Sequence, residues 1–373
     1  MKVLFTGGGT GGHIFPIVAV AREIKKINPE AELIFIGPGS KEFDLLLQEE
    51  GIKIKRISTG KIRRYSGFGY FLQNVLDLFF RVPLGIIQSF FYIFFLSPDL
   101  IFSKGGHGAF PAIISAKMLQ VPVFIHESDI VPGVVNKKSS RQALEIFTSF
   151  PETEFFPVEK MILVGNPIRA DLIQNIDLSK FEEKIGFQKT KPVLLAMGGS
   201  QGSERINDLV LSVLPNLLSR FQVIHQCGHE NFKGITVQAD FLIPKNLRKN
   251  YYLFPFLTEE QLKYVYCASD IVVSRAGSGS IFEIAAFEKP SILIPLPESA
   301  QGHQLKNAYF YAKFGAATIL EEENITSHLF EQKVSDLLGN SAEIKEMARK
   351  AKEFSRPRSA KVIAGYIVEF LNQ

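Results

Sequence analysis

The stretch KVLFTGGGTGGHIFP, residues 2–16, decides the fold. An apolar run from Val3 to Phe5 leads into five glycines within the six residues 7–12, and His13 and Pro16 then open an apolar, helix-like segment. The pattern predicts a buried strand, a Gly-rich loop and a helix in succession. A loop of this kind offers free backbone N–H groups at a helix N-terminus, so it predicts a site for an anion or a polar sugar.

Short apolar runs that end in glycine or polar residues recur along the chain. They read AELIFIGPG, LIFSKGG, VPVFIHES, MILVGNP, PVLLAMGGSQG, FQVIHQCG, YYLFPF, DIVVSRAGSG and PSILIPLP. Runs without polar alternation are typical of parallel strands that helices cover on both faces, which predicts a doubly wound α/β architecture. A second Gly-rich unit about half a chain after the first predicts two similar domains, residues 1–165 and 166–355.

Composition limits the classes of partner. The 373 residues carry a net charge of +4, with 46% hydrophobic and 21% charged residues, as in globular proteins. This mild positive charge suits anionic small molecules or an acidic membrane surface and is too weak to indicate nucleic acid. Cys227 and Cys267 lack metal-type spacing and are expected to be free thiols. Met1 leads directly into a strand, so no signal peptide is expected and the protein is expected to be cytoplasmic.

One segment, residues 68–96, departs from the pattern because it is rich in phenylalanine. Its apolar part from Val82 to Leu96 is 15 residues long, shorter than the ~20 residues of a membrane-spanning helix. Phenylalanines cover more than one helical face, and Lys61, Arg63 and Arg64 precede them. We therefore predict partial contact with a membrane interface, with burial against the sheet as the alternative.

Polar side chains follow several predicted strands and would meet at the same sheet edges. Ser200, Ser278 and Arg275 could contact phosphate oxygens, and Glu283 could accept the hydroxyls of a ribose. Further polar groups follow other strands: His126, Glu127, Asp129, Asn136, Gln301, His303, Gln304 and Asn307.

The segments GGTGGHIFP, VGNPIR, GGSQGSERIN, FEIAAFEKPSILIPLP and GHQLKNA occur in this order. Together they resemble the MurG family of UDP-N-acetylglucosamine transferases over essentially the whole chain. The resemblance implies the GT-B fold, two Rossmann-like domains that face each other across a cleft, with a last helix of about residues 356–373 that packs back on the first domain. It also implies an inverting transfer of N-acetylglucosamine to the 4-hydroxyl of the muramyl sugar of lipid I, which forms lipid II at the cytoplasmic face of the membrane.

The resemblance assigns site residues on both sides of the reaction. The catalytic candidates are His13 and Glu127. The donor side is expected to comprise Thr10, Gly11, Gly12, Arg169, Ser200, Gln201, Phe256, Leu257, Arg275, Ala276, Gly277, Ser278, Glu283, His303 and Gln304. The acceptor side is expected to comprise His13, Gly106, His107, His126, Asp129 and Asn136.

The chain departs from the family pattern on the acceptor side. Ser128 and Asp129 replace the amide pair of the family's HEQN segment, and His107, Gly108 and Ala109 stand in the GGYVS loop. These changes bear on acceptor recognition and leave the identity of the donor unaffected.

The chemistry of the sequence favours catalysis without a bound metal. No two aspartates stand two apart, so the metal-binding D-x-D motif of other glycosyltransferases is missing, and the acids Glu321–Glu323 are expected to form a solvated loop. We expect no tightly bound cofactor, although Mg²⁺ could assist through the diphosphate. His13 is the first candidate for the general base, because imidazole titrates near neutral pH.

Other functions share many of these features. A transferase that glycosylates another lipid from a UDP-sugar would differ only in its acceptor, and a UDP-N-acetylglucosamine 2-epimerase would act on the nucleotide sugar alone. A non-catalytic nucleotide-sugar-binding protein and an NAD-dependent oxidoreductase are weaker alternatives. The oxidoreductase would need an acid about 20 residues after the first loop, at the end of the second strand, but Glu32 precedes that strand.

Overall fold

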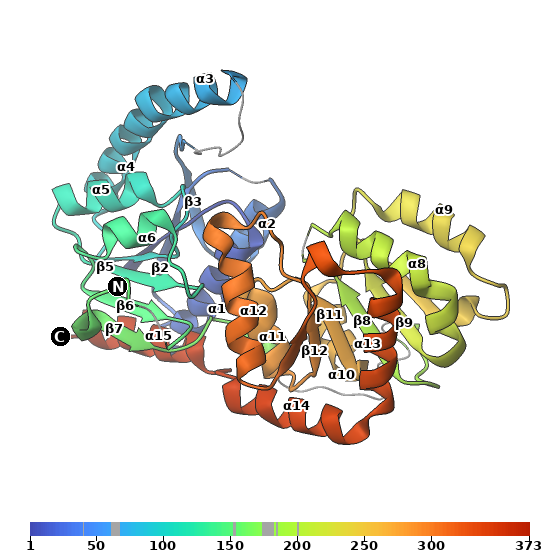
Figure 1. Ribbon diagram of the computed structural model, residues 1–373. Helices are drawn as coiled ribbons and strands as arrows, with labels where there is room; N and C mark the ends of the chain where they lie inside the picture. The colour runs from blue at the N-terminus through green and yellow to red at the C-terminus, as the bar shows by residue number, and fades with distance from the viewer. Residues whose placement is uncertain (40, 61–67, 152–153, 174–182, 184–185, 200) are drawn as a thin grey trace. The chain divides into compact units, whose positions relative to one another are not determined.

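The structure, a computed structural model, describes residues 1–39, 41–60, 68–151, 154–173, 183, 186–199 and 201–373 (Figure 1). The chain divides into two compact units. Unit 1 comprises Met1–Arg169 and Pro357–Gln373, and unit 2 comprises Ala170–Arg356. Each unit is built around one parallel sheet, which confirms the predicted α/β fold class.

The sheet of unit 1 has the strand order β3-β2-β1-β4-β5-β6-β7. Its strands are β1 (Lys2–Thr6), β2 (Glu32–Gly37), β3 (Lys53–Arg56), β4 (Leu100–Ser103), β5 (Val123–Glu127), β6 (Glu145–Thr148) and β7 (Met161–Leu163). The central strands β1, β4 and β5 are buried along nearly their whole length because helices cover both faces of the sheet.

The helices of unit 1 complete its two outer layers. They are α1 (Gly11–Ile27), α2 (Lys41–Glu49), α3 (Phe68–Leu76), the π-helical turn η1 (Asp77–Arg81), α4 (Val82–Leu96), α5 (Phe110–Met118), α6 (Val134–Ser139), the 3₁₀ turn η2 (Val158–Lys160) and α15 (Ser359–Leu371). The last helix, α15, packs its apolar face on α1, where Ile363 and Ile367 join the same core cluster as Ile14 and Ile17. The end of the chain is therefore part of the first core.

Unit 2 repeats the architecture with the strand order β10-β9-β8-β11-β12-β13. The strands are β8 (Val193–Met197), β9 (Gln222–Gln226), β10 (Tyr251–Phe254), β11 (Ile271–Ser274), β12 (Ser291–Leu293) and β13 (Ala317–Ile319). The helices and turns are η3 (Ala170–Leu172), α8 (Glu204–Arg220), α9 (Phe232–Leu242), η5 (Arg248–Asn250), α10 (Glu259–Ala268), α11 (Ser278–Ala286), η6 (Ala300–Gly302), α12 (His303–Lys313), η7 (Glu322–Asn324), α13 (Ser327–Gly339) and α14 (Ser341–Phe354).

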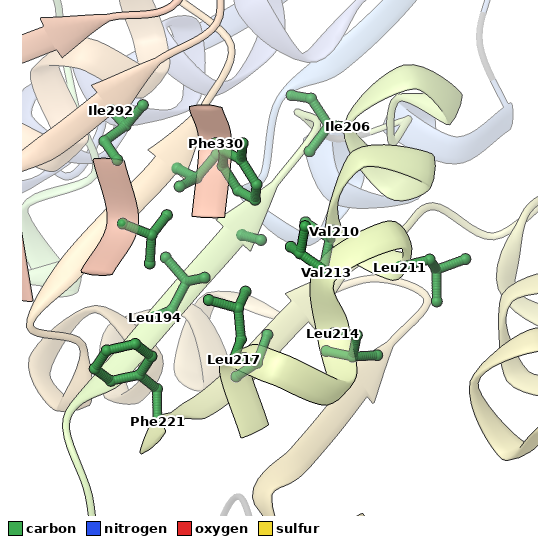
Figure 2. Packing of buried hydrophobic residues seen from close by; sticks show 14 of the residues in the cluster. Leu194, Ile206, Val210, Leu211, Val213, Leu214, Leu217, Phe221, Ile292 and Phe330 are labelled. Atoms are coloured by element: carbon green, nitrogen blue, oxygen red, sulfur yellow. The ribbon is translucent and has the colours of Figure 1, made fainter. Parts of the chain in front are cut away.

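The core of unit 2 forms where α8 lies on the sheet. Val210, Leu214 and Leu217 recur at helical spacing on one face of α8, and Figure 2 shows them with Leu194 of β8 and Phe330 of α13 in one cluster. All five side chains are fully buried. This packing fixes the N-terminus of α8 at the edge of the sheet, where the Gly-rich loop enters.

All ten strands predicted from the apolar runs are present, and β3, β6 and β13 are additional. Strand β3, with the sequence KIKR, and strand β13, with the sequence ATI, lie at sheet edges and are not fully buried. Strand β6 has only four residues and follows a polar segment. Edge strands bury less surface, so their sequences carry a weaker apolar signal, and β6 is buried but has only two apolar residues in succession.

The Phe-rich segment forms a helical arm, defined here as residues 68–96 (α3, η1 and α4), that extends away from the sheet of unit 1 (Figure 1). The apolar stretch Val82–Leu96 forms α4, with the 15 residues counted in the sequence, but the π-helical turn joins α4 to α3 and makes the helical run longer. The run Leu72–Leu96 has 25 residues and a mean hydropathy of 1.7, and by length and composition it could cross a membrane. Only 17% of its most apolar window is buried.

The arm is attached to unit 1 through one narrow face of α4. Gly85, Ser89 and Ile93 are its buried residues, and α4 packs there against α5. The backbone N–H of Ser58 donates a hydrogen bond to Gln88 Oε1 (2.7 Å). A Cβ on Gly85 would lie 1.9 Å from the carbonyl oxygen of Ser58, so only glycine permits this close approach.

Replacement of Gly85 by alanine should therefore loosen the attachment of the arm. We expect Gly85→Ala to destabilise the protein by about 1–3 kcal/mol through overpacking, measured by urea unfolding. Gly234→Ala is the matched control, because Gly234 also lies within a helix and its Cβ would meet nothing within 4 Å. Equal stability of the two variants would contradict this account of the attachment.

Candidate active site

The strand order reverses once in each sheet, between β1 and β4 in unit 1 and between β8 and β11 in unit 2. In open parallel sheets, ligands bind outside the carboxyl ends of the strands at such a reversal. The loops that follow these four strands are the Gly-rich segments singled out in the sequence. Each unit therefore has a candidate binding edge, described separately below.

His13 lies in the first turn of α1, directly after the loop that follows β1. Its Nδ1 is 2.9 Å from the hydroxyl oxygen of Thr10, and its backbone N–H donates to the Thr10 carbonyl (2.9 Å). Thr10 is the N-cap residue of α1, and Gly11 and Gly12 begin the helix. The predicted residues of this loop thus lie together around one half-buried imidazole.

Two glycines make room for this imidazole ring. A Cβ on Gly8 would lie 2.8 Å from His13 Nδ1, and a Cβ on Gly106 would lie 2.8 Å from His13 Nε2. Gly106 follows β4 and has a φ of +78°, a conformation that favours glycine. Burial between these backbones, together with the positive charges of Lys104 and His107, lowers the pKa of His13 to about 3. The ring is therefore a neutral proton acceptor at physiological pH.

Glu127, the last residue of β5, is buried and accepts three hydrogen bonds. Its Oε1 accepts from the backbone N–H of Asp129 (3.1 Å), and its Oε2 accepts from the N–H of Gly133 (3.0 Å) and from Asn136 Nδ2 (2.9 Å). Burial and the nearby Asp129 raise the pKa of Glu127 to about 7. A carboxyl group with a pKa near neutrality is suited to proton transfer, but this one also holds the β5–α6 connection in place.

A buried lysine, Lys104, lies at the same edge and was not singled out in the sequence. It follows β4, and its ammonium donates to His126 Nδ1 (2.6 Å), to Ser128 Oγ and to Asn166 Oδ1 (3.3 Å). His126 Nε2 donates to the Gly165 carbonyl (3.0 Å), so Nδ1 carries the lone pair that faces the lysine. The only sequence signal was the position of Lys104 between a strand and a Gly–Gly pair.

The remaining candidates of unit 1 have different surroundings. Asn136 Nδ2 also donates to the His126 carbonyl (3.1 Å), and Asn136 Oδ1 is buried with no hydrogen-bond partner among the described residues. Arg169 is buried, with its guanidinium 4.4 Å from the centre of the Phe15 ring. His107 is half-buried.

In unit 2, the loops after β8 and β11 bring small and polar residues to one edge. Ser200 lies outside the described residues, and its neighbour Gln201 is exposed. Gly277 is the N-cap residue of α11. Ser278 is buried, and its Oγ has no hydrogen-bond partner among the described residues. The N-terminus of a nine-residue helix and a buried hydroxyl without a partner there are suited to a phosphate oxygen.

The sequence predicted that Arg275 would contact phosphate oxygens of a ligand, but in the structure its guanidinium is bound by protein groups. Its guanidinium donates to the Ile294 carbonyl (3.1 Å), to Ser203 Oγ (2.8 Å) and to a carboxylate oxygen of Glu322. The predicted solvated loop Glu321–Glu323 is therefore wrong for Glu322, whose side chain is only 13% exposed and pairs with both Arg275 and Arg205. The turn after β13 carries Glu322 back to the carboxyl edge of the sheet, where the two arginines lie.

The polar candidates Glu283, Gln304 and Asn307 lie on α11 and α12. Glu283 is half-buried on α11, with Tyr266 Oη 3.5 Å from its Oε2. Gln304 Oε1 accepts from the backbone N–H of Leu296 (3.0 Å), which ties the start of α12 to the loop after β12. Asn307 Nδ2 donates to the carbonyl of Ala276 (3.4 Å).

Two aromatic rings lie beyond the ends of β9 and β10. The Phe256 ring stacks on His229 with centroids 5.9 Å apart and an interplanar angle of 16°, and the next residue, Leu257, is buried. His303 begins α12 and is half-buried. Over the part of the chain that the structure describes, no group of three or more His, Cys, Asp or Glu residues could hold a metal ion.

Comparison with known proteins identifies the family. Residues 3–148 match the glycosyltransferase family 28 N-terminal domain, and residues 193–363 match the glycosyltransferase family 28 C-terminal domain. A UDP-N-acetylglucosamine–N-acetylmuramyl-(pentapeptide) pyrophosphoryl-undecaprenol N-acetylglucosamine transferase from Clostridium botulinum (strain Loch Maree / Type A3) is 38% identical over 343 residues, 91% of each chain.

Solved structures agree with these matches. The crystal structure of Acinetobacter baumannii MurG superposes with a TM-score of 0.73 at 25% identity over 99% of both chains. A UDP-GlcNAc 2-epimerase from Neisseria meningitidis gives a TM-score of 0.70, but at 16% identity over 99% of this chain and 100% of its own, it shows a shared fold alone.

The two parallel α/β units with Gly-rich loops at their strand reversals, and the matches to both domains, define a glycosyltransferase of the GT-B type. The chain belongs to glycosyltransferase family 28 and, within it, to the MurG enzymes.

The position of the His13 ring depends on its glycine neighbours. We expect Gly8→Ala to displace the ring and break its contact with the Thr10 hydroxyl, which would shift the NMR signals of the His13 imidazole. Gly9→Ala is the matched control, since its Cβ would make only an ordinary contact of 3.5 Å with Pro38. Unchanged His13 signals in Gly8→Ala would contradict the proposed role of this glycine.

Proposed function

We propose that this protein transfers N-acetylglucosamine from UDP-N-acetylglucosamine to the 4-hydroxyl of the N-acetylmuramyl sugar of lipid I, so that the β-1,4 link of lipid II forms. The similarity to the Clostridium botulinum transferase over 91% of both chains supports this activity. The structural observation that carries the mechanism is the neutral imidazole of His13, held between Gly8 and Gly106 at the strand reversal of unit 1.

Unit 2 is proposed to bind the donor. Glu283 would accept the two ribose hydroxyls, and Phe256 and Leu257 would present backbone groups to uracil. Ser200, Gln201, Ala276, Gly277 and the Ser278 hydroxyl, at the N-terminus of α11, would surround the diphosphate. Arg275 would act by holding this loop through Ser203 and Glu322, because its guanidinium is already occupied by protein partners. His303 and Gln304 would contact the sugar.

Unit 1 is proposed to bind the acceptor, with Gly106, His107, His126, Asp129 and Asn136 around the muramyl sugar and its diphosphate. Thr10, Gly11, Gly12 and Arg169 would contribute to the donor side. The free enzyme holds the pKa of His13 at about 3, which makes the imidazole a weak base. Bound diphosphates would raise this pKa, since nearby negative charge favours the protonated ring.

The chemical step follows from these roles. The 4-hydroxyl oxygen attacks the anomeric carbon of the α-linked sugar, its proton passes to His13, and the bond from the anomeric carbon to the UDP oxygen breaks. The N–H groups at the start of α11 would stabilise the negative charge that develops on UDP. Glu127 is the second candidate for the base. We expect any Mg²⁺ to act on the diphosphate rather than through protein ligands.

The helical arm would bring unit 1 to the lipid acceptor at the cytoplasmic face of the cell membrane. Its exposed apolar residues are Leu72, Leu76, Leu78, Phe79, Phe80, Leu84, Ile87, Phe91, Phe94 and Phe95. We propose peripheral contact with an anionic membrane surface rather than a crossing, because Gly85, Ser89 and Ile93 hold α4 on α5. The basic residues Lys61, Arg63 and Arg64, which support this proposal by sequence, lie outside the described residues.

The first test is release of UDP from UDP-N-acetylglucosamine with and without a lipid I analogue. Wild-type release should require the analogue, and His13→Ala should lower kcat by ~10²-fold or more, as expected for loss of a general base. Glu127→Gln should lose activity by more than His13→Ala if Glu127 is the base instead.

Several outcomes would change the assignment. Interconversion of the free nucleotide sugar without an acceptor would indicate an epimerase. If UDP release depends on another lipid, such as diacylglycerol, the proposed donor site would stand and the proposed acceptor would be wrong. Binding of UDP-N-acetylglucosamine without turnover under any condition would indicate a binding protein.

Membrane contact is tested separately from catalysis. Substitution of Phe79, Phe80, Phe94 and Phe95 by serine should abolish binding to vesicles that contain anionic lipid, while turnover of a water-soluble acceptor analogue stays near the wild-type rate. Phe241→Ser is the matched control, because Phe241 is 90% exposed on α9 in the other unit. Vesicle binding that survives the arm substitutions would exclude the arm as the contact surface.

A further inference from the structure

Four charged residues of unit 2 form a chain of ion pairs at the carboxyl edge of its sheet. Arg275 pairs with Glu322, and Glu322 also pairs with Arg205. Arg205 in turn pairs with Glu298 (2.9 Å). The four residues follow four different strands, since Arg205 comes after β8, Arg275 after β11, Glu298 after β12 and Glu322 after β13. The chain of ion pairs therefore connects four strand ends that are far apart in the sequence.

The inner pair of this chain, Arg275 and Glu322, is largely buried, and the outer pair is not. The side chain of Arg275 is 9% exposed, whereas that of Arg205 is 55% exposed. Removal of one partner from a buried ion pair leaves the other charge uncompensated, while an exposed pair contributes little. The carboxylate of Glu322 therefore determines where the Arg275 guanidinium lies, and Arg205 adds a weaker contact from the solvent side.

The Arg275 guanidinium, held by Glu322, also binds two other loops. Its Nη2 donates to Ser203 Oγ (2.8 Å), and its Nη1 donates to the Ile294 carbonyl (3.1 Å). Ser203 is the N-cap residue of α8 and directly follows the Gly-rich segment 198–202. Arg275 therefore ties the end of the Gly-rich loop after β8 to the end of β11.

The residues that follow Arg275 form the other part of the proposed diphosphate site. Ala276 and Gly277 lead into α11, and Asn307 Nδ2 donates to the Ala276 carbonyl (3.4 Å). Ser278 begins α11, and its buried Oγ has no hydrogen-bond partner among the described residues. Because Arg275 is next to this segment and bound to Ser203, it links the two loops that are proposed to surround the diphosphate.

We propose that Glu322 is a positioning residue for the diphosphate of the donor. Its carboxylate holds Arg275 on Ser203, and this contact keeps the loop after β8 and the start of α11 in the arrangement that binds the diphosphate. Glu322 acts through Arg275 rather than on the donor itself. The inference rests on the proposed function, in which these two loops bind the diphosphate of UDP-N-acetylglucosamine.

The test compares the binding of UDP and of uridine to wild type and Glu322→Gln. Glutamine keeps the size of the side chain and a hydrogen-bond acceptor but removes the charge. We expect the Kd of UDP and the KM of UDP-N-acetylglucosamine to rise about tenfold, with kcat within about threefold of wild type. The Kd of uridine, which has no diphosphate, should stay within about twofold of wild type, whereas general structural damage would weaken both ligands.

A double variant, Arg275→Met with Glu322→Gln, keeps the proposal testable if the single variant does not fold. It has no uncompensated charge at the inner pair, and removal of a complete buried pair is often tolerated. It also lacks the contact between the guanidinium and Ser203. We therefore expect it to bind UDP about tenfold more weakly than wild type, as Glu322→Gln does, because both substitutions break the same link.

Glu323→Gln is the matched control for loss of an acid from this turn. Glu323 is the exposed neighbour of Glu322 in η7, so its replacement should leave the affinity for UDP unchanged. Wild-type affinity for UDP in the double variant would overturn the proposal. Equal losses of UDP and uridine binding, or a tenfold loss of UDP affinity in Glu323→Gln, would also overturn it, because the effect would then be general.

The binding measurements need no turnover, which separates this inference from the proposed function. If UDP binding depends on Glu322 as expected but the wild-type protein releases no UDP with a lipid I analogue, the role of Glu322 stands and the transferase activity is refuted. If transfer to the analogue is normal but Glu322→Gln binds UDP as tightly as wild type does, the role of Glu322 is refuted and the transferase is retained.

Discussion

The parallel arrangement of both sheets is the constraint on which the rest of the structure depends. Parallel strands must be covered by helices on both faces, and every connection then returns the chain to the same edge. The carboxyl ends of β1, β4 and β5 therefore lie side by side in unit 1, as do those of β8 and β11 in unit 2. Polar groups from distant parts of the sequence meet at this edge because their burial in the apolar core would be unfavourable.

The binding edge of unit 1 depends on the close approach of side chains to the backbone of its glycines. The imidazole of His13 fits between Gly8 and Gly106, and Asn136 packs against Gly105. These glycines come from two loops about 100 residues apart in the sequence, so neither loop alone defines the position of the ring. The close backbone also shields the imidazole from water, and this desolvation lowers the pKa of His13 and keeps the ring neutral.

The buried cations of the two units have different hydrogen-bond partners. In unit 2 the positive charge of Arg275 is matched by the carboxylate of Glu322, and the pair holds two loops together. In unit 1 the ammonium of Lys104 donates to the neutral acceptors His126, Ser128 and Asn166, and the carboxylates of Glu127 and Asp129 lie close enough to act on its charge.

The sequence by itself determined the α/β class, ten of the strands, the Gly-rich loops and the family, because continuous apolar runs and local motifs are properties of adjacent residues. It missed the edge strands β3 and β13, which are not fully buried, and β6, which is buried but has only two apolar residues in succession. Only the tertiary structure decided that η1 joins α3 and α4 into one long arm, that Glu322 pairs with Arg275, and that Lys104 lies beside His13. The last two features depend on contacts between residues far apart in the chain, and such contacts form only when the sheets bring the strand ends together.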